Sequence, residues 1–120
     1  MNWSLRQLLE LLCFPFAIAA GQMLFKRAAT QIDSTSGVSW LLQVARLPTM
    51  WIAVALYAAA TLLWVRILMT VPLSRAYPFV ALAFVLVPAA GYVFFHESVS
   101  LRYAAGTALI IAGVIVAARA

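Results

Sequence analysis

The sequence predicts an all-α membrane protein, a single domain over residues 1–120 whose four transmembrane helices form an antiparallel bundle. Hydrophobic residues make up 67% of the chain and charged residues 9%, a balance that would leave a water-soluble domain of this size with large exposed apolar patches. Four apolar runs approach the roughly 20 residues that a helix needs to cross the hydrocarbon core. Because lipid offers no hydrogen-bond partners, each run must satisfy its own backbone as a helix.

The first predicted helix spans residues 7–27 and ends at Lys26-Arg27. Its apolar run and the small residues Ala17-Ile18-Ala19 look like a secretory signal with a cleavage site. The run continues beyond that site to Phe25, however, and three further apolar segments follow. We therefore expect a retained membrane helix.

The other predicted helices span residues 50–71, 76–95 and 101–118. In the long first connection, residues 31–37 are polar and turn-like, and residues 40–46 are suited to a short helix at the membrane surface. Tight links at residues 72–75 and 96–100 predict that the second, third and fourth helices are antiparallel neighbours. Ser100 or Ser98 is expected to cap the fourth helix.

The basic residues are divided evenly between the two membrane sides. With an even number of spans the termini share one side, which takes Arg6, Arg66, Arg75 and Arg119, while the other side takes Lys26, Arg27, Arg46 and Arg102. The positive-inside rule therefore predicts no orientation, which is compatible with an antiparallel homodimer and equally with a topology imposed by a partner. The net charge of +5 belongs at helix ends beside lipid headgroups, so nucleic acid is not an expected partner.

The sequence contains no motif that indicates covalent catalysis, a disulfide or a metal site. Cys13 is the single cysteine and lies in an apolar run, which excludes an intramolecular disulfide and a metal-ligand spacing. No nucleotide-binding glycine loop is present, and Ser74 and Tyr77 have no matching histidine. We predict a protein without enzyme activity, cofactor or metal.

Polar residues near the membrane boundaries are the candidate substrate-binding groups. Gln22 and Lys26 are four residues apart and share a helix face. Glu97 ends the third predicted helix and Arg102 starts the fourth, both on the same membrane side as Lys26. Such charges suit a headgroup phosphate and a sugar, or else they extend to ordinary lipid phosphates and pair with one another. Arg66, about five residues inside the end of the second helix, either snorkels to the interface or binds phosphate.

Prolines and small residues mark two further features. Pro15 and Pro88 interrupt predicted helices, which indicates either transporter sites or simple kinks. The fourth helix carries a stripe of small residues that permits close helix approach, with a partner either in the chain or across a dimer. The stripe consists of Ala105, Gly106, Ala112 and Gly113.

Three segments resemble a known superfamily. Residues 71–79, 94–102 and 106–114 look like the drug/metabolite transporter superfamily, in its four-helix EamA-like and small multidrug resistance members. Ala20-Gly21-Gln22 followed by Lys26, with Ala76-Tyr77-Pro78 and His96-Glu97-x-Val99-Ser100-x-Arg102, is more narrowly similar to subunits of the flippase for undecaprenyl-phosphate-linked aminoarabinose.

This resemblance implies a flippase subunit that moves an undecaprenyl-phosphate-linked sugar across the bacterial inner membrane for attachment to lipid A. It implies no enzyme activity, and a dimer with a second copy or a paralogous subunit as the working unit. It also adds Tyr77 to the candidate substrate-binding residues. The substrate can alternatively be a small amphipathic molecule.

The chain departs from the drug exporters at one position. Their first helix carries an acidic residue that binds protons and cationic drugs, whereas the corresponding stretch here is Phe16-Ala17-Ile18-Ala19-Ala20. An exporter of small cationic or amphipathic molecules is therefore the less favoured alternative.

Overall fold

The computed structural model describes residues 3–33 and 37–119. Ser34, Thr35 and Ser36, which belong to the predicted polar turn, lie outside the described residues. Within the described ranges every regular element is a helix, and four apolar stretches are long enough to cross a membrane. The prediction of an all-α protein with four membrane spans is confirmed.

Helix α1 (Leu5–Thr30) is longer than predicted at both ends. Ser4 caps its first turn by accepting a hydrogen bond from the Gln7 amide, and the Gln7 side chain accepts one from the Ser4 amide in return. The helix continues without a break through Pro15, whose ring is buried. The sequence had indicated an interruption at Pro15, and this prediction was wrong.

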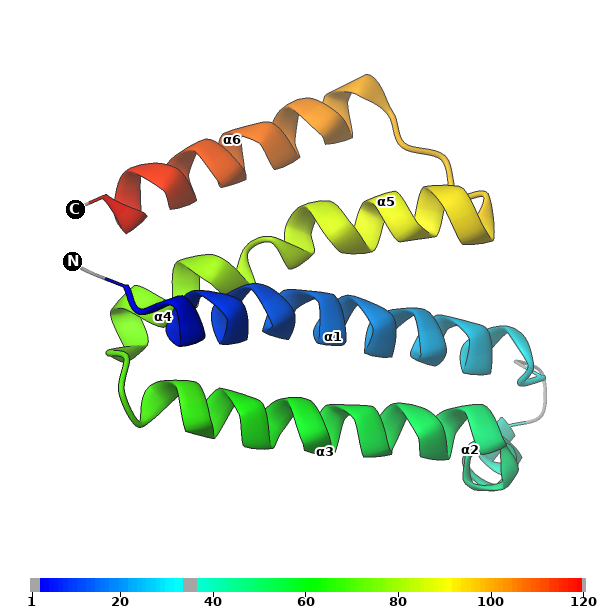
Figure 1. Ribbon diagram of the computed structural model, residues 1–120. Coiled ribbons are helices and arrows are strands. Elements are labelled where there is room, and N and C mark those ends of the chain that lie inside the picture. Colours follow the sequence, from blue (N-terminus) through cyan, green and yellow to red (C-terminus); the bar gives the residue numbers. More distant parts are fainter. Residues whose placement is uncertain (1–2, 34–36, 120) are drawn as a thin grey trace.

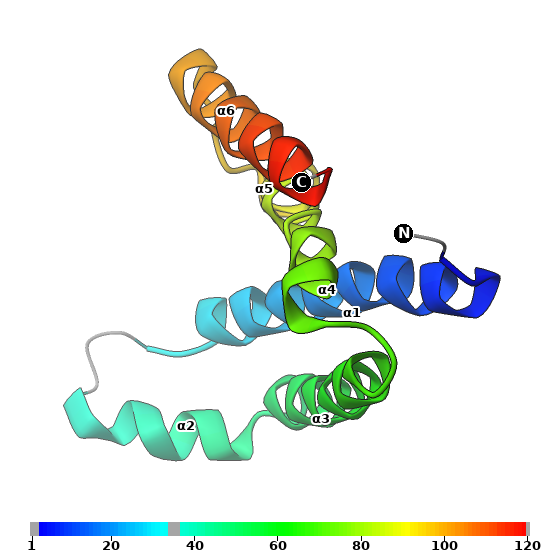
Figure 2. The same cartoon turned by 90° about the vertical axis from the view of Figure 1, so that its left-hand side faces the viewer.

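The first connection contains a 3-10 turn, η1 (Gly37–Ser39), and a short helix, α2 (Trp40–Arg46). The helix predicted at residues 40–46 is thus present. It is seen end-on in Figure 1 and lengthwise in Figure 2, so it lies across the end of α3 and not along it. Helix α3 (Pro48–Leu68) begins with proline at its first position, where the missing N–H costs no helical hydrogen bond.

The third membrane span consists of two helices, α4 (Leu73–Val80) and α5 (Ala83–Phe95), separated by a break at Ala81 and Leu82. The third helix was predicted over residues 76–95 with an interruption at Pro88, but α5 continues through Pro88 and the break lies at Ala81 and Leu82 instead. The predicted link over residues 72–75 was also wrong, because α4 begins at Leu73. At the break the amides of Ala81 and Leu82 donate to carbonyls three residues earlier, at 3.2 Å each. The break lies between Pro78 and Pro88, which supply no N–H to the helical ladder on either side.

Helix α6 (Leu101–Ala118) completes the fold. Before it, His96 follows the last residue of α5 and adopts the left-handed backbone conformation, with φ of 55°. The Ser100 hydroxyl then accepts a hydrogen bond from the Tyr103 amide at 3.0 Å, which confirms Ser100 as the cap of the fourth span.

The helices lie in the order α6, α5, α1, α3 across the molecule, and both termini are at one end (Figures 1 and 2). We call this the terminal end, and the opposite end, which carries α2 and residues 96–100, the loop end. Helix α1 packs mainly on α3 and α5, and the core joins α1, α3 and α4. Its buried residues are Leu11, Phe14, Ala60, Ile67, Val71 and Ala76.

The tight link between the second and third spans had predicted that they are neighbours. The structure shows that they are not neighbours along their length. Helix α1 lies between them, and α3 meets the third span chiefly through α4. A short link holds only the two helix ends that it joins. Small residues at the α1–α3 contact, such as Gly21 and the buried Ala53 and Ala60, permit the closer packing of α1 on α3.

Candidate functional site

The six predicted substrate-binding residues divide between the two ends of the bundle. The directions of the helices place Arg66 and Tyr77 toward the terminal end. They place Lys26, Glu97 and Arg102 at the loop end, with Gln22 one turn deeper in α1. The structure thus forms no single cluster of the six, but two polar regions separated by the apolar centre of the bundle.

At the terminal end, Glu10 joins α1 to α3. One carboxylate oxygen, Oε1, accepts from Arg6 Nε at 2.9 Å and from Arg66 Nε at 3.2 Å. The Glu10 side chain is 14% exposed, whereas that of Arg66 is 58% exposed. Arg66 is therefore a partly exposed partner of Glu10 and not a buried cation facing a cavity.

Tyr77 lies on α4 with an exposed side chain. Its ring packs edge-on against Trp64 of α3, with ring centroids 6.1 Å apart. It also lines a hollow of about 460 Å³ between α4 and α6, beside Ser74, Pro78 and Val114. This position leaves the phenol accessible from the terminal end.

The candidate charged residues at the loop end, Lys26, Glu97 and Arg102, form no ion pair with one another. All three side chains are exposed. The Glu97 carboxylate folds back over α5, where its Oε1 would lie 3.1 Å from a Cβ built at Gly91. Lys26 and Arg102 therefore do not neutralise Glu97 through direct ion pairs.

Gln22 has a partner that the sequence reasoning missed. Its Nε2 donates to the hydroxyl oxygen of Tyr57 on α3 at 2.6 Å. The Tyr57 ring packs on Phe25 at a centroid distance of 5.0 Å and approaches the backbone at Gly21. The available signal was a tyrosine within the apolar run of the second span, where a hydroxyl requires a partner.

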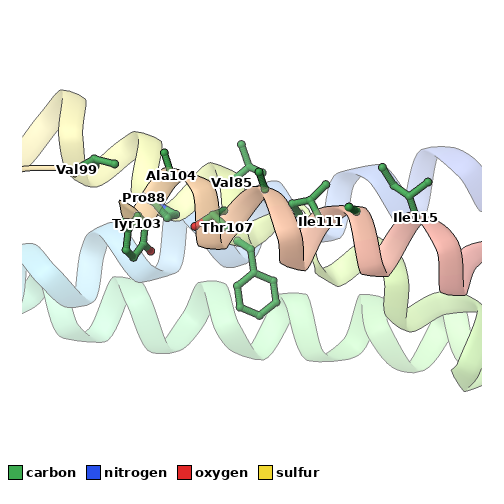
Figure 3. A pocket seen from close by; sticks show the side chains of 11 residues that line it. Val85, Pro88, Val99, Tyr103, Ala104, Thr107, Ile111 and Ile115 are labelled. Carbon is green, nitrogen blue, oxygen red and sulfur yellow. The ribbon is translucent and has the colours of Figure 1, made fainter. Parts of the chain in front are cut away.

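Two adjoining hollows extend from Gln22 toward α6. Gln22 lines a cavity of about 300 Å³ together with Pro88 and Tyr103. Pro88 and Tyr103 also line an open groove of about 490 Å³ between α5 and α6. Figure 3 shows this groove with Val85 and Pro88 on α5 and with Tyr103, Thr107, Ile111 and Ile115 along α6. Its walls are almost wholly apolar.

The small-residue stripe lies on an exposed part of α6. All four residues, Ala105, Gly106, Ala112 and Gly113, are exposed. Within residues 3–33 and 37–119, a Cβ at Gly106 or Gly113 would have no atom within 4 Å other than its chain neighbours and the nearby backbone of α6 itself. The described part of the chain therefore does not supply the close helix partner that the stripe predicts.

Comparison with known proteins places the chain among named relatives. It is 33% identical over 109 residues to the probable 4-amino-4-deoxy-L-arabinose-phosphoundecaprenol flippase subunit ArnE of Hamiltonella defensa, which covers 89% of this chain and 91% of the relative. The same subunit of Salmonella paratyphi B is 36% identical over 101 residues, covering 82% and 86%. That of Enterobacter sp. strain 638 is 42% identical over 67 residues, covering 54% and 63%.

No protein-family model matches the sequence, and no solved structure matches it. The relatives are named as flippase subunits, which are transport proteins and not catalysts. The similarity extends over nearly the whole length of the first relative. This multi-pass membrane protein belongs to the family of the ArnE flippase subunits.

Proposed function

We propose that this protein is a subunit of a flippase that moves 4-amino-4-deoxy-L-arabinose linked to undecaprenyl phosphate across the bacterial inner membrane. The sugar is thereby delivered to the periplasmic leaflet for attachment to lipid A. The observation that carries the proposal is the 33–36% identity to named ArnE subunits over more than four fifths of the chain.

The geometry is consistent with this task. A flippase must pass a polar headgroup through the bilayer while the polyprenyl tail stays in hydrocarbon, so it needs a path that is open sideways to lipid. The groove between α5 and α6 is open along its length and nearly apolar, and it adjoins the cavity that contains Gln22. Basic residues at both ends, Arg66 and Lys26 among them, suit a phosphate that enters at one end and leaves at the other.

A dimer, formed with a second copy or with a paralogous subunit, is the proposed working unit. None of the described residues of α6 is buried, and its small-residue stripe lacks an intrachain partner. Without hydrophobic drive in lipid, close contact between small residues is a principal way for membrane helices to associate. The stripe at Ala105, Gly106, Ala112 and Gly113 is accordingly the proposed interface.

The test is complementation of a strain that lacks its own subunit, with lipid A analysed by mass spectrometry and the membrane abundance of each variant measured in the same cells. We expect Lys26→Ala and Glu97→Ala each to abolish aminoarabinose addition at unchanged abundance, because a headgroup phosphate and amine lose their charged partners. Arg46→Ala, which removes an exposed basic charge from α2, is the matched control and should leave addition intact.

Two results would contradict the proposal in different ways. Failure of the wild-type chain to restore addition, although it is present in the membrane, would argue against the flippase function. Normal addition in both variants would remove Lys26 and Glu97 from the site and leave Gln22, Arg66, Tyr77 and Arg102 as the candidates.

A further inference from the structure

The hydrogen bond between Gln22 and Tyr57 joins two membrane-spanning helices, with Gln22 exposed and Tyr57 partly buried at the surface of the bundle. The bond measures 2.6 Å and joins α1 to α3. The Tyr57 ring is held in place on one side by Phe25, at an interplanar angle of 33°, and it occupies space that a side chain at position 21 would fill. Because an unpaired amide or phenol in hydrocarbon costs several kcal/mol, on the order of 2–7, these two groups keep each other paired.

The direction of this bond determines which atoms remain for a ligand. The amide nitrogen of Gln22 points to Tyr57, so the amide oxygen, Oε1, is left as an acceptor with no partner among the described residues. The Tyr57 oxygen accepts from Gln22, which leaves its own hydroxyl hydrogen available to donate. The pair therefore offers one acceptor and one donor.

Gln22 borders a cavity of suitable size and composition. The volume of about 300 Å³ equals that of roughly ten waters at about 30 Å³ each, which is room for one monosaccharide ring. Apolar side chains such as Ile18 and Val87 form most of the wall, and Tyr103 of α6 contributes a second hydroxyl-bearing side chain. A few polar groups in an apolar wall are typical of a site that orients a small polar ligand.

We infer that Tyr57 is a positioning residue that turns the Gln22 amide oxygen toward this cavity, where it accepts a hydrogen bond from a hydroxyl or ammonium group of a sugar headgroup. The inference rests on the proposed flippase function. An acceptor oxygen attracts sugar hydroxyls and ammonium groups but repels phosphate oxygens. The Gln22 amide oxygen therefore recognises the sugar and not the phosphate, for which the exposed cations at the loop end are the suitable partners.

The experiment measures binding of two lipids to the purified full-length protein in lipid nanodiscs. The probes are undecaprenyl phosphate and its aminoarabinose conjugate, so that the ratio of the two dissociation constants reports recognition of the sugar alone. Tyr57→Phe keeps the ring that packs on Phe25 and removes the hydroxyl. Gln22→Leu removes the amide, and Tyr92→Phe is the matched control because Tyr92 is exposed on α5 with no side-chain hydrogen bond in the described part of the chain.

We expect Tyr57→Phe to weaken binding of the conjugate by about 3- to 20-fold, the range that corresponds to one hydrogen bond within a membrane protein. Binding of undecaprenyl phosphate should not change. Gln22→Leu should cause at least as large a loss, and the double variant should be no worse than Gln22→Leu, because Tyr57 acts through Gln22. Tyr92→Phe should resemble the wild type for both lipids.

Each other outcome has a distinct meaning. Wild-type protein that binds neither lipid argues against the proposed function itself. Wild-type protein that prefers the conjugate, together with an unchanged preference in Tyr57→Phe, overturns the inference and leaves the function standing. If Tyr57→Phe weakens binding of both lipids equally, or if the losses of affinity add in the double variant, the contact is only structural. Either result also overturns the inference.

Discussion

Replacing Gly21 with alanine is the sharpest test of the contact between α1 and α3. A Cβ at position 21 would overlap the Tyr57 ring at Cε2 and would lie 2.7 Å from Cδ2 and 3.3 Å from Cζ. The ring cannot move freely, because Phe25 packs on it at a centroid distance of 5.0 Å and its hydroxyl is bonded to Gln22. The two helices must therefore separate, or the ring must leave its position.

The expected cost follows from two opposing terms. Overpacking of a filled site destabilises by about 1–3 kcal/mol, and alanine regains about 0.5–1 kcal/mol over glycine through its better helix propensity. We expect a net loss of about 1 kcal/mol in the free energy of unfolding. Displacement of Tyr57 should also break its hydrogen bond with Gln22.

The assay is equilibrium unfolding in mixed micelles of a mild detergent and sodium dodecyl sulfate, followed by circular dichroism. Gly91→Ala is the matched control, since a Cβ there would meet only the flexible Glu97 carboxylate, with Oε1 at 3.1 Å. That variant should be as stable as the wild type or slightly more stable. Combining Gly21→Ala with Tyr57→Ala should recover part of the loss, because the clash disappears with the ring.

If the Gly21→Ala variant is as stable as the Gly91→Ala variant, the close approach of Gly21 to Tyr57 is not required in the membrane protein. Additive losses in the double variant would lead to the same conclusion. Either result would remove the packing argument for the position of the Tyr57 hydroxyl, and the Gln22 contact would then have to be tested on its own.

Three further predictions concern other parts of the molecule. Glu10→Gln should lower the free energy of unfolding by about 0.5–1 kcal/mol, since both arginine partners are largely exposed. A double-mutant cycle with Arg66→Gln should show a coupling energy of similar size, and zero coupling would show that the ion pair does not contribute to stability. Gly113→Leu should dissociate the dimer in detergent, measured by sedimentation, whereas an intact dimer would indicate that the stripe faces lipid. An imposed pH gradient should not drive uptake of a quaternary ammonium dye into vesicles; uptake that persists without Glu10 and Glu97 would contradict the flippase function.

The local features of the fold could be predicted well from the sequence. Composition and the length of the apolar runs predict four membrane spans because the thickness of the bilayer sets the helix length, independently of how the helices pack. The cap at Ser100 and the short helix Trp40–Arg46 likewise depend on residues close together in the chain. The family resemblance was also carried by short motifs, and the named relatives bear it out.

The candidate site was predicted less completely. Positions four apart along one helix, such as Gln22 and Lys26, share a face, and this much follows from helix geometry. Which residue of another helix meets that face does not follow, so Tyr57 was missed as the partner of Gln22 and Arg66 was not expected to pair with Glu10. In lipid the apolar faces of helices are nearly equivalent, and hydrophobic periodicity therefore says little about which helix packs on which.

The sequence by itself determined that this protein is a four-span helical membrane protein and which family it resembles. Only the tertiary structure decided that α1 lies between α3 and α5, that the third span breaks at Ala81 and Leu82, and that α6 stands at the edge with its stripe uncovered. The first set depends on backbone hydrogen bonding and transfer from water to lipid, which act residue by residue. The second depends on side-chain contacts between segments far apart in the chain, where one glycine opposite one tyrosine sets how closely two helices approach.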